Sequence, residues 1–361
     1  MPFQIIRNDI TKVTADAIVN TANPRPIVGG GTDAAVYRAA GEKQLLAERQ
    51  KIGDIARGSA AETPAFNLNA KYIIHTVGPI WIDGQHGERE TLRSCYKQSL
   101  ELAHSLSCES IAFPLIATGV YGFPKDEALN IALAEIGSFL LRHEMNITLV
   151  VFDRNALQLS KELLGDIEEY IDEHTVGLLR AREYGGSGRT DRRRRINEER
   201  RRRDIDRQLS MAEEIPEEDM FVPSAPVMAA KESAPLSGHI SLDDILKRKE
   251  DTFQQRLFKL IDERHLSDPE VYKRANIDRK VFSKIRCNKD YRPKKKTAVA
   301  FAIALELDMP TMIDLLSRAE IAFSPSSKFD LIISYFVDRR IYDIFQINAA
   351  LFEYDQELLG C

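Results

Sequence analysis

Several features that define large classes of protein are missing from this chain of 361 residues. It has only four cysteines, and their wide spacing excludes the CxxC unit of zinc and thiol redox sites: Cys95, Cys108, Cys287 and Cys361. We interpret them as reduced thiols, and we expect no metal and no cofactor. No apolar run approaches the roughly 18 residues of a membrane span. The N-terminus also lacks the features of a secretion signal, so we expect a cytoplasmic protein with no membrane partner.

An excess of one charge is also missing, since 50 Lys and Arg stand against 55 Asp and Glu. Taken as one number, the net charge of −5 argues against a nucleic-acid partner. The charges are unevenly distributed, because residues 1–175 hold 16 basic and 23 acidic side chains. Between Val271 and Lys296, eleven basic residues stand against two acidic ones. A basic patch is therefore predicted near the C-terminus of an acidic protein.

The pattern of apolar residues divides the chain into three parts. In residues 1–175, short apolar runs alternate with helical periodicities, which predicts an α/β domain with a mostly parallel sheet covered on both faces. Residues 176–240 are expected to be a charged linker containing Pro, Ala and Ser, with ten arginines between Arg189 and Arg207. Residues 241–361 contain helix formers throughout and predict an all-α domain, with a helix start at Ser241.

Individual elements of the first part can be assigned residue ranges. The expected strands are Phe3–Arg7, Ala17–Asn20, Tyr72–Thr76, Ser110–Phe113 and Thr148–Phe152. The expected helices are Ala34–Ala40, Glu90–Leu106, Lys125–Arg142 and Asn155–Tyr170. Ligands of such a domain are expected in the loops beyond the carboxyl ends of the strands.

The first of these loops is rich in glycine. It leads from Asn23 to three adjacent glycines, Gly29–Gly31, and then into a helix that carries Asp33 in its first turn. Adjacent glycines contribute no packing, which indicates that a ligand approaches the main chain closely, and a helix N-terminus favours an anion such as phosphate. The alternative is an ordinary glycine-rich turn in which Asp33 caps the helix.

A second glycine-containing loop also lies between a strand and a helix. Gly119 and Gly122 allow a concave row of backbone N–H groups, and Tyr121 and Phe123 can cover the face of a sugar or base. Two such loops would hold a diphosphate from opposite sides. No lysine follows the glycines as in the GxxxxGK[ST] loop, and Asp33 stands where a GxGxxG loop would have its third glycine.

These segments resemble the macrodomain family, whose members bind ADP-ribose. The resemblance covers about residues 1–175 and rests on Asn8–Thr11, the NTAN and GGGTD sequences, Tyr72–Pro79 and the IATGVYGFP loop. It implies a three-layer α/β fold with a mixed, mostly parallel sheet, and ADP-ribose or an ADP-ribosylated protein as the partner. The ligand-binding residues that it implies are Asp9, Ile10, Asn20, Gly29, Gly30, Gly31, Thr118, Gly119, Val120, Tyr121, Gly122, Phe123 and Phe152.

Within that family, the sequence resembles the branch that hydrolyses ADP-ribose esters. The resemblance implies that Asp33 orients or deprotonates a water and that Asn23 positions the ribose hydroxyls. That branch commonly has a histidine where this chain has Tyr37, which is a poor base near neutral pH. His75 lies in an apolar strand pattern, so we interpret it as a core residue. The implied substrates are ADP-ribose esters of protein Asp and Glu, with O-acetyl-ADP-ribose as a further candidate. The alternative is a non-catalytic ADP-ribose reader.

Residues 252–320 resemble a helix-turn-helix unit of the phage-repressor type. Asn276 takes the turn site where a left-handed backbone is needed, and Tyr272 stands where that family prefers a small residue. The resemblance implies a DNA-binding domain that targets the enzyme, with contacts from Arg279, Lys280, Ser283, Lys284 and Arg286. A protein-docking domain is the alternative. The apolar stretches Phe329–Phe336 and Ile341–Leu351 need burial, either in the helical core or in a dimer interface.

Overall fold

The computed structural model of the chain describes residues 2–152, 159–184 and 251–360. The described residues before Thr175 and those after Glu250 fall in one compact unit. The N-terminal and C-terminal parts therefore belong to one unit. The helix start predicted at Ser241 and most of the predicted linker 176–240 lie outside the described residues. The boundaries drawn at residues 175 and 240 stay predictions.

The N-terminal part is built on a six-stranded sheet in the order β1-β6-β5-β2-β4-β3. Its strands are β1 (Phe3–Arg7), β2 (Ala17–Thr21), β3 (Ala60–Pro64), β4 (Tyr72–Thr76), β5 (Ser110–Pro114) and β6 (Asn146–Val151). Neighbouring strands are parallel except for β3, which pairs antiparallel with β4. The mixed, mostly parallel sheet is confirmed. Strand β3 was not predicted, because its sequence AAETP lacks the β-branched and aromatic run of a typical strand.

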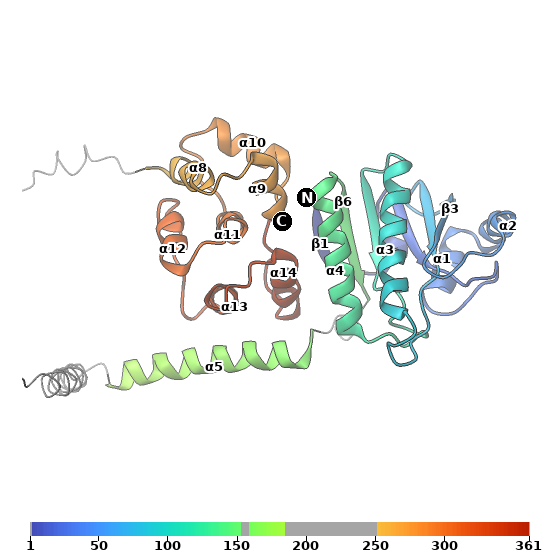
Figure 1. Ribbon diagram of the computed structural model, residues 1–361, viewed down its shortest axis with the longest axis horizontal. Helices are drawn as coiled ribbons and strands as arrows, with labels where there is room; N and C mark the ends of the chain where they lie inside the picture. Colours follow the sequence, from blue (N-terminus) through green and yellow to red (C-terminus); the bar gives the residue numbers. More distant parts are fainter. Residues whose placement is uncertain (1, 153–158, 185–250, 361) are drawn as a thin grey trace, which may run out of the picture. The chain divides into compact units, whose positions relative to one another are not determined.

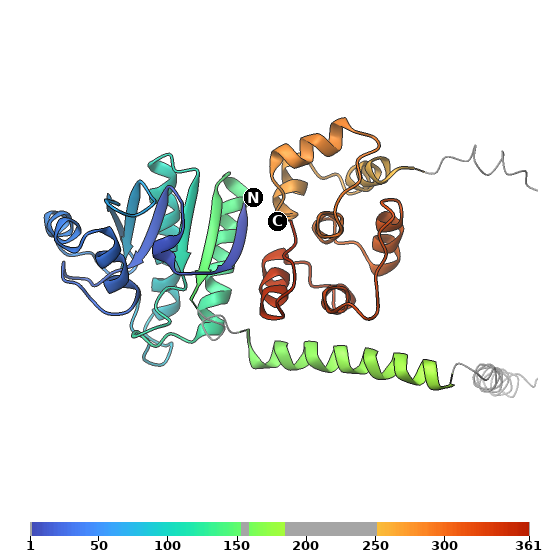
Figure 2. The same cartoon turned by 180° about the vertical axis from the view of Figure 1, so that it is seen from behind.

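Helices cover both faces of this sheet, as Figures 1 and 2 show from opposite sides. One face carries α3 (Glu88–Ser105) and α4 (Lys125–Arg142), and the other carries η1 (Ile10–Lys12), α1 (Thr32–Ala40) and α2 (Glu42–Ile52). Successive residues of β2 alternate between the two cores, since Val19 packs with α3 and α4 and Ile18 packs with α1. The predicted three-layer arrangement is confirmed.

Two other helices differ from the prediction. Helix α2 was not predicted, because its sequence EKQLLAERQKI is mostly polar. The last helix of the N-terminal part, α5 (Lys161–Tyr184), begins later and ends later than expected, and residues 155–158 of the predicted helix lie outside the described residues. Of the helices described, none has the length and apolar character of a membrane span.

The C-terminal part is helical over its described residues, as predicted. Its helices are α8 (Phe253–Glu263), α9 (Asp268–Arg274), α10 (Arg279–Cys287), α11 (Lys295–Ala304), α12 (Met309–Ser317), α13 (Lys328–Asp338) and α14 (Ile344–Glu353). Side-chain caps fix several helix starts, for example Thr252 at α8 and Asp308 at α12, each accepting a hydrogen bond from a first-turn N–H. Proline occupies the first turn of α9 and of α12, where its missing N–H is not needed for the helix.

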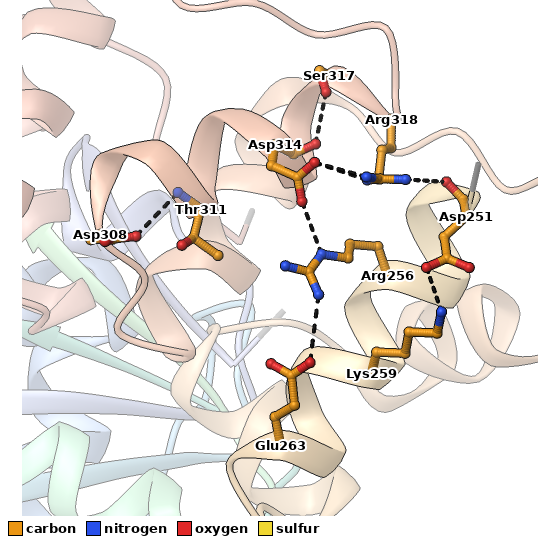
Figure 3. A network of polar contacts seen from close by, with 9 residues as sticks. All are labelled: Asp251, Arg256, Lys259, Glu263, Asp308, Thr311, Asp314, Ser317 and Arg318. Atoms are coloured by element: carbon orange, nitrogen blue, oxygen red, sulfur yellow. Dashed lines mark hydrogen bonds and ion pairs between the residues drawn. The ribbon is translucent and has the colours of Figure 1, made fainter. Parts of the chain in front are cut away.

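An ion-pair network joins α8 to α12 (Figure 3). Nε of Arg256 donates to Oδ2 of Asp314 over 2.9 Å, and Nη2 of Arg318 donates to the other carboxylate oxygen of Asp314 over 2.9 Å. Arg318 also donates to the backbone carbonyl of Asp251, whose side chain pairs with Lys259. The network ties the N-terminal half of α8 to the end of α12.

The C-terminal helices pack against β1 and α4 of the N-terminal part. Asn276, between α9 and α10, has the predicted left-handed backbone with φ of +53°. Its side-chain Oδ1 accepts from Phe3 N over 2.9 Å, and its Nδ2 donates to Phe3 O over 2.9 Å. Phe345 of α14 meets the Phe3 ring edge-on at 5.3 Å and lies against Gly137 of α4. The two apolar stretches predicted to need burial are buried in the helical core and in this contact.

Tyr272 also serves this contact. Its hydroxyl donates to Oε1 of Glu144 over 2.9 Å, and its ring lies 5.7 Å from the ring of Phe282 on α10. Beside it, Nζ of Lys273 donates to the carbonyl of Leu141 over 3.0 Å. The large side chain at position 272 therefore fills space between α9, α10 and the N-terminal part.

Candidate active site

A pocket of about 420 Å³ opens between the loop after β2 and the loop after β5. Both strands are parallel neighbours, so the loops leave the sheet at the same edge. The first loop leads into α1 and the second into α4, and residues from the first turns of both helices line the pocket. Gly31 and Pro124 begin these helices without a capping side chain. Two helix N-termini with their N–H groups therefore border one cavity, which suits a ligand with two negative charges.

Glycines shape the two loops in different ways. Gly29 lies so close to the carboxylate of Asp33 that a Cβ there would come within 3.0 Å of Oδ2. Gly31 and Gly122 have φ values of +60° and +66°, a region that favours glycine. The N–H of Gly122 donates to the carbonyl of Gly119 over 3.0 Å and closes a tight turn. The glycines thus bring the backbone close to Asp33 in one loop and reverse its direction in the other.

Asp33 is buried and held through both carboxylate oxygens. Oδ1 accepts from Nδ2 of Asn20 over 2.6 Å, and Oδ2 accepts from the N–H of Gly29 over 2.6 Å. Nδ2 of Asn20 also lies 3.2 Å from Nδ1 of His75, whose Nε2 lies 3.0 Å from Oγ1 of Thr63. Because an amide nitrogen only donates, Nδ1 of His75 accepts and Nε2 carries the hydrogen. A chain of hydrogen bonds thus runs from β3 to Asp33.

The environment shifts the pKa values of three groups in this region. Burial raises the pKa of Asp33, although the hydrogen bonds from Asn20 and Gly29 favour its charged form. Burial, with the charge of Asp33, raises the pKa of Tyr37 to about 12. Burial lowers the pKa of His75 to about 3, so this histidine is neutral at physiological pH. His75 is a buried core residue with both ring nitrogens partnered, as the sequence predicted.

A buried arginine supports the first loop through hydrogen bonds to its backbone. Arg49 of α2 donates through Nη2 to the carbonyls of Asn23, over 3.3 Å, and Pro24, over 3.1 Å. Its Nη1 donates to the carbonyl of Gly53. On the other side of the loop, Oδ1 of Asn23 accepts from the N–H of Arg25 over 3.2 Å. The backbone of Asn23 in the first loop is therefore fixed by the side chain of Arg49 from α2.

Comparison with known proteins agrees with this geometry. A family model described as Macro domain matches residues 19–132. A macro domain-containing protein of Methanosarcina mazei is 44% identical over 167 residues, which cover 46% of this chain and 89% of that protein. The chain belongs to the macro domain family. An O-acetyl-ADP-ribose deacetylase of Salmonella newport is 43% identical and matches 45% of this chain and 93% of its own length. A solved Oceanobacillus iheyensis macrodomain with ADP is 38% identical with a TM-score of 0.42, covering 46% of this chain and 92% of the solved one.

The macrodomain pocket brings together residues that are far apart in the sequence. Among its lining residues are nine that the sequence singled out, namely Asn23, Gly29, Gly30, Gly31, Asp33, Thr118, Gly119, Val120 and Tyr121. Six others lie outside this lining, namely Asp9, Ile10, Asn20, Gly122, Phe123 and Phe152. The first group gathers the candidate catalytic pair with both glycine loops.

The residues outside the lining have other contacts in the macrodomain. Asp9 caps η1, since its Oδ1 accepts from the N–H of Thr11 over 2.9 Å, and Ile10 is buried in the core. Phe123 is buried and meets the ring of Trp81 edge-on at 4.6 Å. Phe152 is 76% exposed. A direct role in ligand binding for these residues stays a prediction.

Sequence reasoning missed several residues of this site. Lys125 lines the pocket at the start of α4, and its position directly after the second glycine loop is a signal that could have identified it. Arg49 gives no such signal, because an arginine in a polar helix looks like a surface residue until the fold buries it. Trp81 is linked to the second loop by its backbone N–H, which donates to the carbonyl of Tyr121 over 2.9 Å.

One group of side chains within the described residues has the composition of a metal site, although the sequence predicted none. Asp83, His86 and Glu88 lie close enough together to offer ligands to one ion. Each of them already has partners in the protein. Glu88 accepts from the N–H groups of Ile82, over 3.2 Å, and Gly84, over 3.1 Å, while Asp83 accepts from His86 over 3.0 Å. The contacts of Asp83, His86 and Glu88 therefore stabilise the loop that contains them, and this explains their proximity without a metal ion.

The predicted nucleic-acid contacts lie on α10. All five side chains are exposed there, namely Arg279, Lys280, Ser283, Lys284 and Arg286. Arg279, Lys280 and Ser283 also line a cavity of about 720 Å³ whose opposite wall includes His143 and Glu144 of the macrodomain. The first turns of α10 therefore face the macrodomain across this cavity.

Proposed function

We propose that the macrodomain binds ADP-ribose in the 420 Å³ pocket and hydrolyses esters that join ADP-ribose to carboxylic acids. Binding is supported by the two glycine loops and two helix N-termini, which supply backbone N–H groups and favourable dipoles for a diphosphate. Residues 1–175 carry more acidic than basic side chains, so these local groups are needed to hold an anion. Hydrolysis is supported by the 43% identity to a protein named O-acetyl-ADP-ribose deacetylase.

The observation that carries the catalytic proposal is the placement of Asp33. Its carboxylate lines the pocket and is fixed at both oxygens by Asn20 and Gly29. In the proposed reaction, Asp33 orients a water that attacks the anomeric carbon of the distal ribose and accepts its proton. The new bond joins the water oxygen to that carbon, and the bond to the carboxylate leaving group breaks. Asn23, held by Arg49, positions the ribose hydroxyls.

The surrounding groups fit this assignment. Tyr37 remains a neutral phenol near pH 7, because its pKa is about 12, and His75 is neutral and buried. Neither group competes with Asp33 for the role of base. Burial raises the pKa of Asp33, which makes it a stronger base than an ordinary carboxylate. Substrates of the proposed enzyme are ADP-ribose esters of protein Asp and Glu, and O-acetyl-ADP-ribose.

The test measures ADP-ribose release by the full chain from both substrates. We expect Asp33→Ala to lower kcat/KM by about a hundredfold, the smaller end of the usual loss of a general base. Asn23→Ala is expected to lower it by at least about tenfold through lost positioning. The enzyme proposal is contradicted if calorimetry shows that the wild type binds ADP-ribose but neither ester is hydrolysed. The protein would then be a non-catalytic ADP-ribose reader.

For the C-terminal helices we propose a docking role, and the partner that they contact in this chain is the macrodomain itself. The turn residue Asn276 bonds to β1, and Tyr272 and Lys273 of α9 bond to the end of α4. Part of the predicted basic patch is neutralised within the protein, since four of its residues form ion pairs with acidic side chains: Arg274, Arg286, Arg292 and Lys295. These contacts favour docking over presentation to a duplex.

Targeting to DNA through α10 is the second candidate, and it rests on the resemblance to a phage-repressor helix-turn-helix unit and on the exposed basic residues of α10. A mobility-shift titration of the full chain over a salt series decides between the two. Binding that weakens steeply as salt rises would support the DNA role. Absence of binding at low salt is the result expected from the docking role.

A further inference from the structure

The segment that follows β4 borders both loops of the pocket. The N–H of Ala22 donates to the carbonyl of the last residue of β4 over 2.9 Å. Gly78 lies against the second loop, where an added Cβ would come within 3.1 Å of Cβ of Ala117. Trp81 then donates to the carbonyl of Tyr121. Ala22, Ala117 and Tyr121 line the pocket, so this segment contacts residues of the pocket wall from outside the lining.

Three large aliphatic side chains are exposed on this segment and on the adjoining second loop. Ile80 and Ile82, on either side of Trp81, are 49% and 65% exposed, and Val120, next to Tyr121, is 87% exposed. The hydrogen bond between Trp81 and Tyr121 brings the two short stretches together. We call Ile80, Ile82 and Val120 the mouth rim. A cluster of exposed apolar groups beside a binding pocket is typical of an interaction surface.

The loop that carries Ile82 is fixed in place. The carboxylate of the buried Glu88 accepts from the N–H groups of Ile82 and Gly84. Arg89 donates to the carbonyl of Gly84 over 2.7 Å, and its guanidinium lies 5.3 Å from the centre of the Trp81 ring. These polar contacts fix the loop in a conformation in which the apolar side chain of Ile82 is exposed to solvent. Covering that side chain with a partner would be favourable.

We propose that the mouth rim binds the polypeptide of an ADP-ribosylated protein on either side of the esterified Asp or Glu. This inference rests on the proposed function and adds a basis for its substrate choice. The protein portion of such a substrate leaves the pocket at its mouth, where neighbouring apolar side chains of an extended segment would pack on Ile80, Ile82 and Val120. Ile80 and Ile82 lie outside the pocket lining, so hydrolysis of O-acetyl-ADP-ribose, which carries no polypeptide, is not expected to depend on them.

The positive charge of Arg57 beside the mouth rim also suits an extended polypeptide segment. Arg57 is exposed, its guanidinium lies 5.4 Å from the centre of the Tyr121 ring, and its Nη1 donates to the carbonyl of Gly78 over 2.6 Å. A cation fixed at this place attracts an acidic residue near the modified one. The partner is therefore an extended polypeptide with apolar and acidic residues beside the ADP-ribosylated side chain.

The experiment compares two substrates with the full chain, namely O-acetyl-ADP-ribose and a protein carrying ADP-ribose on a glutamate. Ile80→Ser and Ile82→Ser are the test variants, and Ile313→Ser on α12 is the matched control, because Ile313 is 49% exposed and lies in the C-terminal part. We expect each test variant to lower kcat/KM for the protein substrate about fivefold, through KM, and to leave the small ester within about twofold. The control is expected to change neither.

Loss of activity on both substrates to the same extent, or on neither, would overturn the role of the rim. If the wild type binds ADP-ribose but hydrolyses neither ester, the proposed hydrolysis fails and the rim is tested by affinity. In that case, the test variants are expected to weaken binding of the ADP-ribosylated protein about fivefold and to leave binding of free ADP-ribose unchanged. Equal affinities of wild type and variants for the modified protein would then overturn the inference.

Discussion

Asn20 donates a hydrogen bond of 2.6 Å to Oδ1 of Asp33 and is itself fully buried. The family resemblance implies that Asn20 binds the ligand, and this stays a prediction; in the structure Asn20 lies outside the pocket lining and bonds to the carboxylate of Asp33. The same nitrogen also contacts His75. We therefore propose that Asn20 acts on the chemistry through Asp33, as a positioning residue that favours the ionised carboxylate.

Replacing Asn20 should change the pH dependence of hydrolysis. Asn20→Ala removes a hydrogen bond that lowers the pKa of Asp33, while burial, which raises it, remains. The base then loses its proton only at higher pH, so the acidic limb of the kcat/KM profile should move to higher pH. Thr63→Val is the matched control, because it breaks the bond to His75 without touching Asp33. An unchanged acidic limb in Asn20→Ala would contradict the role of Asn20.

Tyr37 stands where the related hydrolases commonly have a histidine, and its phenol is not expected to act as a base. Its pKa of about 12 keeps the hydroxyl neutral throughout the pH range of most assays. Tyr37→Phe should therefore keep kcat/KM within about threefold of the wild type between pH 6 and pH 9. A loss of more than about tenfold would show that the hydroxyl takes part in catalysis.

Arg49 should support both stability and the shape of the first loop. Arg49→Met removes one donor from each of three backbone carbonyls, of which that of Pro24 keeps the N–H of Ile55. We expect the free energy of unfolding to fall by about 3 kcal/mol, measured by urea denaturation. Binding of ADP-ribose, measured by calorimetry, should weaken as well, because Asn23 loses its support.

Arg49→Lys is the control for the charge of this residue. It keeps the positive charge but loses the planar fork that reaches several carbonyls. If lysine restores wild-type stability and binding, the charge of Arg49 is what matters, and the argument from its hydrogen bonds is wrong.

The hydrogen bonds of Asn276 to β1 can be tested separately from its left-handed backbone conformation in the turn between α9 and α10. Asn276→Gly keeps a backbone that accepts the left-handed conformation and removes both hydrogen bonds to Phe3. We expect the free energy of unfolding to fall by about 2 kcal/mol and the amide of Phe3 to exchange faster with deuterium.

A matched variant is available for this experiment. Arg340 is exposed and has a φ of +57°, so Arg340→Gly tests a glycine at a left-handed position between α13 and α14. This control should be neutral or slightly stabilising. If Asn276→Gly behaves in the same way, the hydrogen bonds to Phe3 contribute nothing measurable.

Local patterns in the sequence were enough to predict most of the fold. Helix α4 has the predicted bounds, and the strands at Phe3–Arg7 and Tyr72–Thr76 match as well. Strand β6 ends at Val151, one residue before the predicted end, which leaves Phe152 outside the sheet. Helix α2 and β3 were missed because neither shows a strong apolar pattern, and their positions depend on packing against neighbouring elements.

The candidate site was predictable where the motif itself forms the pocket, as with Gly29–Gly31 and Asp33. Residues that act from a distance were harder to identify. Asn276 shows the limit, since its backbone conformation followed from its turn position, but its hydrogen-bond partner is 273 residues away in the sequence. Burial of Arg49 likewise arises only when α2 packs beneath the first loop.

The bond between Asn276 and Phe3 also bears on solubility. Strand β1 is the end strand of the sheet, and the peptide groups on its outer side would otherwise form an edge that can pair with a strand of another molecule. The carboxamide of Asn276 satisfies one N–H and one C=O on that side, and Phe345 covers the ring next to them. At Phe3, the edge of the sheet is thus closed to a strand of another molecule by a side chain that mimics a peptide bond.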